Sequence, residues 1–390
     1  MLTAHVVVGA NYGDEGKGQL VHDIASGILT ETPKHPLVVR YSGGAQAGHT
    51  VTTDTQRHVF HHFGSGTFLG CPTWLSKEFI LNPMLFVNEL DELNILGIDP
   101  IIYISPRCRV SSPYDMIVNI IREEHRVSRH GSCGCGINET MTRYQTTGVE
   151  WADLVDLAAD EPSFRAYMTT QKEYAEQCCI EIIGSVDSVF DNDIIESYRQ
   201  DVLAMYSASI MDTSAVLNKY DNVIFEGSQG LLLDERYGIF PFLTPGSVGA
   251  EVPLQYVDSV GKDNPGANIN VLVHYPTRPY MTRHGAGPFM TETAKDNIGI
   301  YHPEETNVYN EHQHHFRYGV LDVNSYLNRI FVDATNAFCS VTSTNVTMNY
   351  NPVVTCESHM QGKFPVILDG ERYNVSFNTL KQYIMVHKKG

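Results

Sequence analysis

Short apolar runs alternate with longer amphipathic stretches along much of the chain. Apolar residues at helical spacing predict a helix over Met84–Leu96 and mainly helical structure through residues 151–217. The run Ile330–Phe338 is interpreted as a strand late in the chain. Four further short runs predict buried strands: Val6–Val8, Leu37–Val39, Asn222–Phe225 and Val271–Tyr275. The alternation predicts an α/β protein, and the lack of repeats or linkers predicts a single domain over residues 1–390.

A glycine-rich segment, Gly9–Gly18 (GANYGDEGKG), follows the first predicted strand and leads into an amphipathic stretch. A strand, a glycine-rich turn and a helix together bind phosphate, because backbone N–H groups and the helix N-terminus point at the anion. Lys17 adds a cation. The segment departs from the usual P-loop, since Gly18 replaces the hydroxyl that holds magnesium. Asp14 is then the obvious carboxylate for that metal, although an ordinary turn with solvated acidic residues is the alternative.

A second polar segment follows the predicted strand Leu37–Val39. A Gly43–Gly44 turn brings polar residues to the end of this strand, where open α/β sheets bind their ligands. A lone histidine is more often structural than catalytic. Beside a phosphate loop, however, we interpret His49 as a functional residue.

Composition limits the classes of partner. The net charge of -18 argues against a nucleic-acid or anionic-membrane surface. No run of 18 apolar residues predicts a membrane span, and the N-terminal residues lack the basic region of a signal peptide. The eight cysteines are scattered, with Cys133 and Cys135 as the one close pair suited to a metal. This distribution is typical of reduced thiols in a cytoplasmic enzyme.

The string GDEGKG, Gly13–Gly18, resembles the signature of the adenylosuccinate synthetase family. Further similar segments follow in that family's order, so the resemblance extends from about Val6 to Asp322. They are Arg40–Thr50, Arg129–Ile137, Phe225–Asp234, Gly238–Thr244, Thr282–Phe289 and Glu311–Asp322. The resemblance implies the family's fold, a large, mostly parallel central sheet flanked by helices, with a phosphate site similar to a P-loop.

The resemblance also implies roles for individual residues. Asp14, Lys17 and His49 would be catalytic, and Asp14 and Gly48 would bind Mg²⁺. The ATP and phosphate site would contain Gly13, Asp14, Glu15, Gly16, Lys17, Gly18, Gly48, His49, Thr50, Asn336 and Phe338. The acceptor nucleotide would contact Asp14, Glu15, Gln46, Ala47, Ser132, Cys133, Arg143, Gln229, Leu233, Thr244 and His284. Arg317 would bind L-aspartate.

The implied reaction joins L-aspartate to C6 of a purine nucleoside monophosphate. The C6=O lactam is a poor electrophile, and phosphorylating its oxygen creates a good leaving group. The implied assembly is a homodimer in which an arginine, for which Arg143 is the candidate, reaches the partner's nucleotide. The expected location is the cytoplasm, that of the host if the chain is viral.

Several positions depart from the family pattern. Phe338 stands where the family has the aspartate that reads guanine, and two unpaired donors would cost about 1–3 kcal/mol each. We therefore expect ATP as the phosphoryl donor. Cys133, Cys135 and His284 alter the acceptor site, which favours dGMP and the viral branch of the family that makes 2-aminoadenylosuccinate. The alternatives are an enzyme that uses IMP and, in another class, a GTPase-like nucleotide-binding switch.

Overall fold

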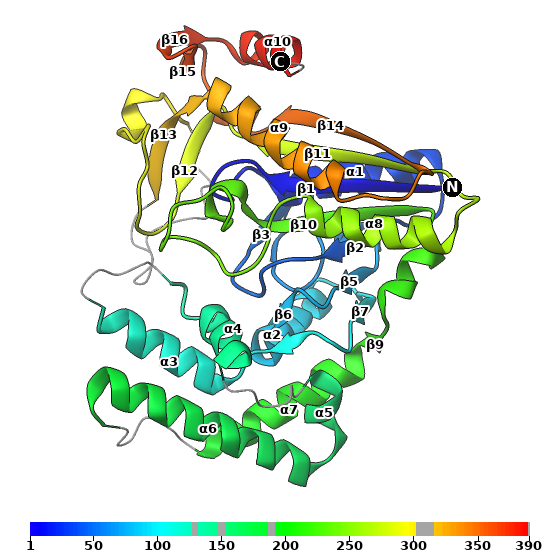
Figure 1. The fold of residues 1–390 in the computed structure, drawn as a ribbon, viewed down its shortest axis with the longest axis vertical. Coiled ribbons are helices and arrows are strands. Elements are labelled where there is room, and N and C mark those ends of the chain that lie inside the picture. The colour runs from blue at the N-terminus through cyan, green and yellow to red at the C-terminus, as the bar shows by residue number, and fades with distance from the viewer. Residues whose placement is uncertain (127–131, 147–152, 186–191, 302–315, 389–390) are drawn as a thin grey trace.

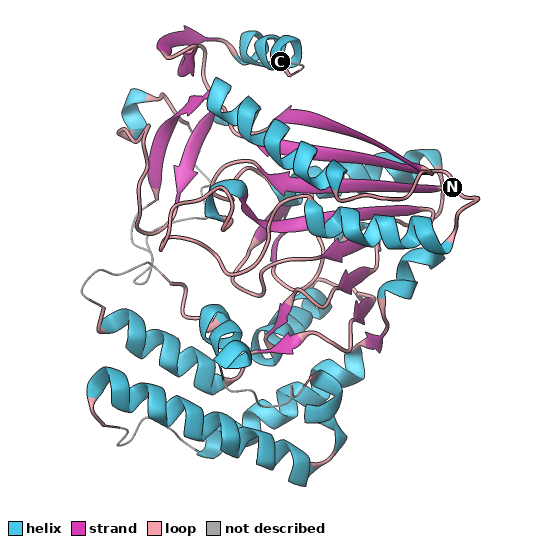
Figure 2. Cartoon of the chain, in the orientation of Figure 1, coloured by secondary structure: helices cyan, strands magenta, loops and turns pink. Residues whose placement is uncertain are grey.

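The computed structural model describes residues 1–126, 132–146, 153–185, 192–301 and 316–388 (Figure 1). One large sheet of eight strands, all paired in parallel, crosses the molecule (Figure 2). From edge to edge its strands are β14 (Val346–Val354), β11 (Ile269–Thr277), β1 (Leu2–Gly9), β10 (Asn222–Gly230), β2 (Leu37–Arg40), β5 (Thr73–Leu75), β7 (Ile102–Ile104) and β9 (Ile210–Met211). This arrangement confirms the predicted α/β fold with a mostly parallel central sheet.

The four predicted buried strands are confirmed as parts of β1, β2, β10 and β11. These strands lie in the interior of the sheet, where residues such as Val6, Val8, Val39 and Val273 are fully buried. Burial on both faces explains why the strands read as continuous apolar runs in the sequence.

Helices pack on the sheet, and a group of helices lies beyond its β7–β9 edge, at the bottom of the molecule as drawn in Figure 1. They are α1 (Lys17–Glu31), α2 (Pro83–Ile95), α3 (Pro113–Glu124), α4 (Ile137–Thr146), α5 (Leu154–Ala159), α6 (Glu161–Ile183), α7 (Asn192–Ala208), α8 (Glu251–Asp263), α9 (Val323–Cys339) and α10 (Phe377–His387). Helices α2, α3, α5, α6 and α7 share an apolar core that includes Phe86, Phe164 and Tyr198. None of the helices in the described part of the chain combines the length and apolarity of a membrane span.

Smaller sheets complete the structure. A second sheet contains β12 (Tyr280–Arg283), β13 (Arg317–Asp322), β15 (Phe364–Leu368) and β16 (Glu371–Val375). Two hydrogen-bonded pairs join β3 (His49–Thr52) to β4 (Arg57–Phe60), and β6 (Ile80–Leu81) to β8 (Arg109–Val110). The helix expected over Met84–Leu96 is confirmed by α2.

The interpretation of Ile330–Phe338 as a strand is wrong, because these residues belong to helix α9. Tyr326, Ile330, Ala334 and Ala337 are buried on one face of that helix, at intervals of three and four residues. A short apolar run does not by itself distinguish a buried helix from a strand. The last strand of the large sheet is β14, which begins seven residues after α9 ends.

Candidate functional site

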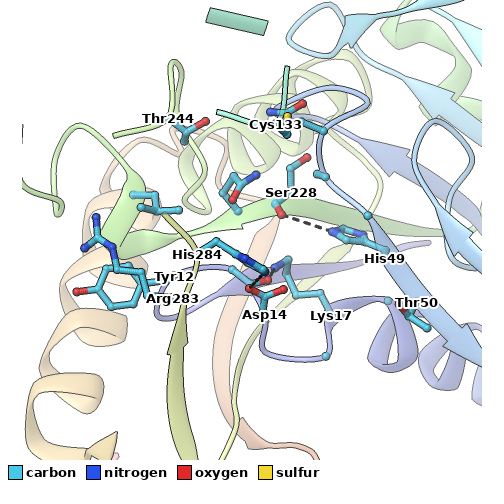
Figure 3. A pocket seen from close by; sticks show the side chains of 18 of the residues that line it. Tyr12, Asp14, Lys17, His49, Thr50, Cys133, Ser228, Thr244, Arg283 and His284 are labelled. Atoms are coloured by element: carbon cyan, nitrogen blue, oxygen red, sulfur yellow. Dashed lines mark hydrogen bonds and ion pairs between the residues drawn. The ribbon is translucent and has the colours of Figure 1, made fainter. Parts of the chain in front are cut away.

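A cavity of about 1300 Å³ opens at the carboxyl ends of the central strands. Loops that follow β1, β2, β10, β11 and β14 line one part of it, and the α3–α4 region lines another (Figure 3). Parallel sheets bind ligands at this edge, because the strand ends bring loops from distant parts of the chain together. Of the predicted site residues, these line the cavity: Gly13, Asp14, Gly16, Lys17, Gly18, Gln46, Ala47, Gly48, His49, Thr50, Ser132, Cys133, Gln229, Leu233, Thr244 and His284.

The loop between β1 and α1 is built as a phosphate cradle. Gly16 has a positive φ of 77° and precedes the first turn of α1, so the N–H groups of that turn are open to an anion. The buried Lys17 side chain donates to the carbonyl of Gly13. A Cβ atom on Gly18 would lie only 3.0 Å from the Cβ atom of His49, which explains a glycine in place of the usual hydroxyl residue.

Glu15 was expected to contact the nucleotides, but its side chain lies inside the phosphate loop. Its side chain is buried, with 3% of the residue exposed, and it does not line the cavity. Its Oε1 accepts hydrogen bonds from the backbone N–H groups of Asn11 and Gly13, each at 2.9 Å. Glu15 therefore braces the phosphate loop from inside and leaves Asp14 as the carboxylate of this loop that faces the cavity.

His49 lies at the start of β3, with its ring buried beside β10. Its Nδ1 lies 2.5 Å from Oε1 of Glu226, whose Oε2 also accepts a hydrogen bond from the backbone N–H of Ser65 at 3.0 Å. Burial lowers the pKa of His49 to about 4, with the charge of Arg40 acting in the same direction and Glu226 opposing it. The neutral ring thus donates Nδ1–H to Glu226, and Nε2 lies 3.5 Å from the Ser228 carbonyl at the cavity wall.

Glu226 and Arg40 are the buried charged residues that lie next to His49. Both are fully buried, and they face each other in the register of the parallel strands β10 and β2. Burial alone would raise the pKa of Glu226. The contact with His49, the charge of Arg40 and the hydrogen bond from Ser65 outweigh burial and hold that pKa well below its usual range. Glu226 is therefore a carboxylate that fixes the orientation of the imidazole.

Asp14 is the residue best placed to hold Mg²⁺. Its side chain is 24% exposed, and no group of three or more histidine, cysteine or acidic residues among the described residues forms a closed metal site. Mg²⁺ commonly binds proteins through one or two carboxylates and completes its shell with water and substrate phosphates. A single carboxylate beside a phosphate cradle fits this pattern.

Besides Glu15, four predicted residues do not line the cavity. Asn336 and Phe338 lie on α9 and are not among the lining residues. Arg143 is buried within its own chain, where its Nε and Nη2 donate to the two oxygens of Asp115 at 2.8 and 2.9 Å. The role of Arg143 toward a partner subunit stays a prediction, since a single chain does not test it. Arg317 forms a bidentate ion pair with Glu292 beside the cavity rather than lining it.

The sequence interpretation also missed lining residues. The largest set is Val353–His359, at and beyond the end of β14. Thr355 in this segment donates to the backbone carbonyl of Glu15 at 2.7 Å, so the segment packs directly against the phosphate loop. The alternation of Val346, Met348 and Tyr350 with polar residues was the available signal for the strand that places it. Other missed residues include Asn119, Arg122, Arg126 and Arg278.

Comparisons with known proteins give a consistent picture. The family described as adenylosuccinate synthetase matches residues 6–383. The adenylosuccinate synthetase of Blochmanniella pennsylvanica is 30% identical over 318 residues, which cover 76% of this chain and 66% of that protein. The enzyme of Buchnera aphidicola subsp. Baizongia pistaciae is 29% identical over 371 residues, or 92% and 81% of the two chains. The match to most of these curated relatives spans about two thirds of their length.

Two solved structures share the fold. Fully ligated adenylosuccinate synthetase from Plasmodium falciparum superposes with a TM-score of 0.71 at 18% identity, covering 99% of this chain and 94% of that one. The succinoaminodeoxyadenylate synthetase of cyanophage S-2L, bound to dGMP and to dATP as an energy donor, gives a TM-score of 0.58 at 13% identity. That superposition covers 100% of this chain and 99% of the other. At these identities the two structures establish similarity of fold.

Proposed function

The chain belongs to the adenylosuccinate synthetase family, and we propose on that basis that it is a carbon–nitrogen ligase joining L-aspartate to a purine nucleoside monophosphate. The observation that carries this proposal is the convergence of three groups in one cavity. The phosphate cradle around Lys17, the Asp14 carboxylate and the Glu226-bound imidazole of His49 all reach it (Figure 3). The phosphate cradle suits an anionic phosphoryl donor, and the carboxylate suits removal of the acidic N1–H proton of a purine. The imidazole suits an oxygen on which negative charge accumulates.

The proposed reaction has two steps. In the first, the terminal phosphoryl group of the donor is transferred to O6 of the purine, N1 loses its proton and the nucleoside diphosphate leaves. In the second, the amine of aspartate attacks C6 and loses a proton. A C–N bond then forms, the C6–O6 bond breaks and inorganic phosphate departs. Proton removal from N1 is essential, because it places negative charge on the oxygen that must attack phosphorus.

Asp14 takes the N1 proton in this scheme, since it is the loop carboxylate open to the cavity. Lys17 and the first turn of α1 hold the donor phosphates. His49 stabilises the charge on O6 and on the transferring phosphoryl group. An anion in the cavity favours protonation of its Nε2, because Glu226 already balances the charge of an imidazolium.

Magnesium would be held by the Asp14 carboxylate and the Gly48 carbonyl, together with phosphate oxygens of the substrates. When bound, the ion neutralises charge on the phosphates during transfer. The chain's own residues orient the donor and move the N1 proton.

The acceptor that we propose is dGMP, with ATP as the donor and 2-amino-2′-deoxyadenylosuccinate as the product. Cys133 and His284, which depart from the family pattern at the predicted acceptor site, both line the cavity. The fold of the cyanophage enzyme, whose structure contains dGMP and dATP, supports the same substrates. Phe338 lies on α9 outside the cavity and therefore gives no preference for ATP over GTP as the donor. The curated relatives favour the alternative acceptor, IMP.

Phosphate release separates a ligase from a nucleotide-binding switch. We expect the protein to release phosphate from ATP only when L-aspartate and a purine monophosphate are both present. Release from the triphosphate alone, unaffected by aspartate, would contradict the proposal. Asp14→Asn provides the matched control, because it retains the size of the side chain and removes the base.

We propose further that residues 1–390 act as one catalytic unit and that the enzyme is a homodimer, as the family resemblance implies. Light scattering at the concentration used for assays tests the second point. The mass of two chains is expected, and the mass of one chain would overturn it.

A further inference from the structure

Helix α3 presents a polar face to the cavity. The residues of this helix that line the cavity follow one another at intervals of three and four positions, so they share one face; they are Asn119, Arg122, Glu123 and Arg126. The loop that carries Cys133 lies beside this face. Figure 3 shows Cys133 on one side of the cavity and Asp14 and Lys17 on the other. The α3 face therefore belongs to the part of the cavity opposite the phosphate cradle.

The Ser132 hydroxyl, which was predicted to contact the acceptor, is engaged within the protein. It donates to Oδ1 of the buried Asn119 at 2.6 Å and accepts from the backbone N–H of Gly134 at 3.3 Å. A serine hydroxyl has one hydrogen to donate, so this hydroxyl cannot donate to a ligand while it binds Asn119. The guanidinium of Arg143 is held by Asp115 of the same chain. An anionic group on this side of the cavity therefore needs a different donor.

Arg122 supplies such a donor. Its Nε donates to Oε1 of Glu139 at 3.1 Å, and the same oxygen accepts from Nδ2 of Asn138 at 3.4 Å. The Glu139 side chain is 1% exposed, whereas that of Arg122 is 33% exposed and lines the cavity. No contact within the described part of the chain occupies the two terminal nitrogens of Arg122, and neither is a buried atom. A buried carboxylate thus fixes the guanidinium at Nε and leaves its terminal N–H groups open to the cavity.

The charges on this side of the cavity are balanced. Glu139 lies 3.1 Å from Arg122, and Glu123 lies 3.5 Å from Arg126, so each acidic residue of the region has a basic partner. The chain as a whole carries a net charge of -18, which repels an anionic ligand. An anion on this side must therefore be held by directed N–H groups. A guanidinium provides them in a planar fork that matches the oxygens of a phosphate.

We propose that Arg122 binds the 5′-phosphate of the acceptor nucleotide through its terminal N–H groups. The inference rests on the proposed function, in which the acceptor is a purine nucleoside monophosphate with its N1–H at Asp14. The phosphate of such a nucleotide lies at the other end of the molecule from N1 and C6, and the α3 face lies across the cavity from Asp14. Arg122 then selects nucleotides over nucleosides and acts on affinity for the acceptor, not on the chemical steps.

The test compares Arg122→Leu with Arg122→Lys, using aspartate-dependent phosphate release from ATP with dGMP, or with IMP if dGMP is not consumed. Leucine removes the N–H groups, whereas lysine keeps the charge and loses the planar fork. We expect Arg122→Leu to raise the KM for the acceptor about 10–100-fold, with kcat changed less than about threefold. Arg122→Lys should raise this KM by a smaller factor, at least about threefold. Arg372→Leu, on the exposed strand β16, is the control.

The matching nucleoside separates phosphate binding from a structural role. Deoxyguanosine, or inosine when IMP is the acceptor, lacks the phosphate and is measured as a competitive inhibitor. Its inhibition constant should be the same in wild type and in both Arg122 variants. The KM for ATP should also be unchanged, because the donor cradle lies on the other side of the cavity. Thermal midpoints report whether each variant is folded.

A wild-type KM for the acceptor in a folded Arg122→Leu variant would overturn the inference and leave the proposed function intact. An inhibition constant of the nucleoside, or a KM for ATP, that rises as much as the KM for the acceptor would also overturn it, because the residue would then maintain the cavity as a whole. If Arg122→Leu does not fold, Arg122→Lys decides, and an unchanged KM overturns the inference. A wild-type protein without aspartate-dependent phosphate release would overturn the proposed function. Calorimetric binding of dGMP to wild type and variant then tests Arg122 separately.

Discussion

The imidazole of His49 and the carboxylate of Glu226 are joined by a contact of 2.5 Å between Nδ1 and Oε1, in a part of the core closed to solvent. The two residues are 177 positions apart in the sequence and meet because the first residue of β3 packs against the middle of β10. The carboxylate holds the ring in one tautomer and one orientation. The arrangement is that of a catalytic imidazole backed by an acidic partner.

Replacing Glu226 by glutamine should lower kcat while the substrates still bind. Glutamine keeps the volume but loses the charge that orients and supports the imidazole, so we expect kcat to fall about 10²–10³-fold. Steady-state kinetics measures the loss. Glu251→Gln, on the partly exposed start of α8, is the control. A Glu226→Gln variant with wild-type kcat would show that the contact serves packing alone.

Asp14→Ala and His49→Ala should each abolish measurable turnover while the fold is retained. The general base and the charge-stabilising group each contribute about 10²–10⁴-fold in rate. Turnover and the circular dichroism spectrum should be recorded on the same samples. Near-normal rates in either variant would remove that residue from the mechanism.

Arg143 is predicted to matter for stability. Arg143→Met would leave the buried carboxylate of Asp115 without its bidentate partner, which should lower the free energy of unfolding by about 3–5 kcal/mol. Urea denaturation measures this change. If the variant is as stable as wild type but binds the acceptor poorly, Arg143 has the intersubunit role expected from the family resemblance.

Acid should destabilise the protein through a histidine pair outside the cavity. His274 on β11 lies with its Nε2 3.0 Å from Nδ1 of His5 on β1, and burial, assisted by the proximity of His5, lowers the pKa of His274 to about 4. In the unfolded chain His274 therefore binds a proton below about pH 6.5, whereas in the folded chain it binds one only below about pH 4. Stability is complete above this window and falls as the pH decreases through it, by about 2–3 kcal/mol.

The thermal midpoint measured between pH 7.5 and 4.5 tests this prediction. His274→Gln should flatten the dependence relative to wild type, whereas the exposed control His387→Gln should not. Identical pH profiles for wild type and His274→Gln would assign the acid sensitivity to other groups.

The fold could be predicted from the sequence where the pattern of apolar residues fits only one kind of element. Buried parallel strands such as β1 and β10 are short apolar runs followed by glycine-rich turns, and the loop motifs that carry Asp14 and His49 follow them directly. Phe338 shows the limit, because an apolar run late in the chain fits a helix face as well as a strand. Placing the last strand there put Asn336 and Phe338 in the predicted donor site, whereas neither residue lines the cavity.

Contacts between distant segments were beyond sequence reasoning. From the sequence, Glu15 is interpreted as a second acid that faces the ligand. Only the folded loop shows that its Oε1 accepts from the backbone N–H groups of Asn11 and Gly13. The approach of His284 to Asp14 depends on how β12 and β13 pack against the phosphate loop. No local pattern of residues encodes that distance.

The central claim is tested most directly by the mass of the product formed in competition. The enzyme is incubated with L-aspartate, ATP, Mg²⁺ and equal concentrations of dGMP and IMP, and the products are identified by mass spectrometry. The account predicts that dGMP is consumed first and that 2-amino-2′-deoxyadenylosuccinate is the main product. Adenylosuccinate as the main product, or a faster reaction when GTP replaces ATP, would contradict it.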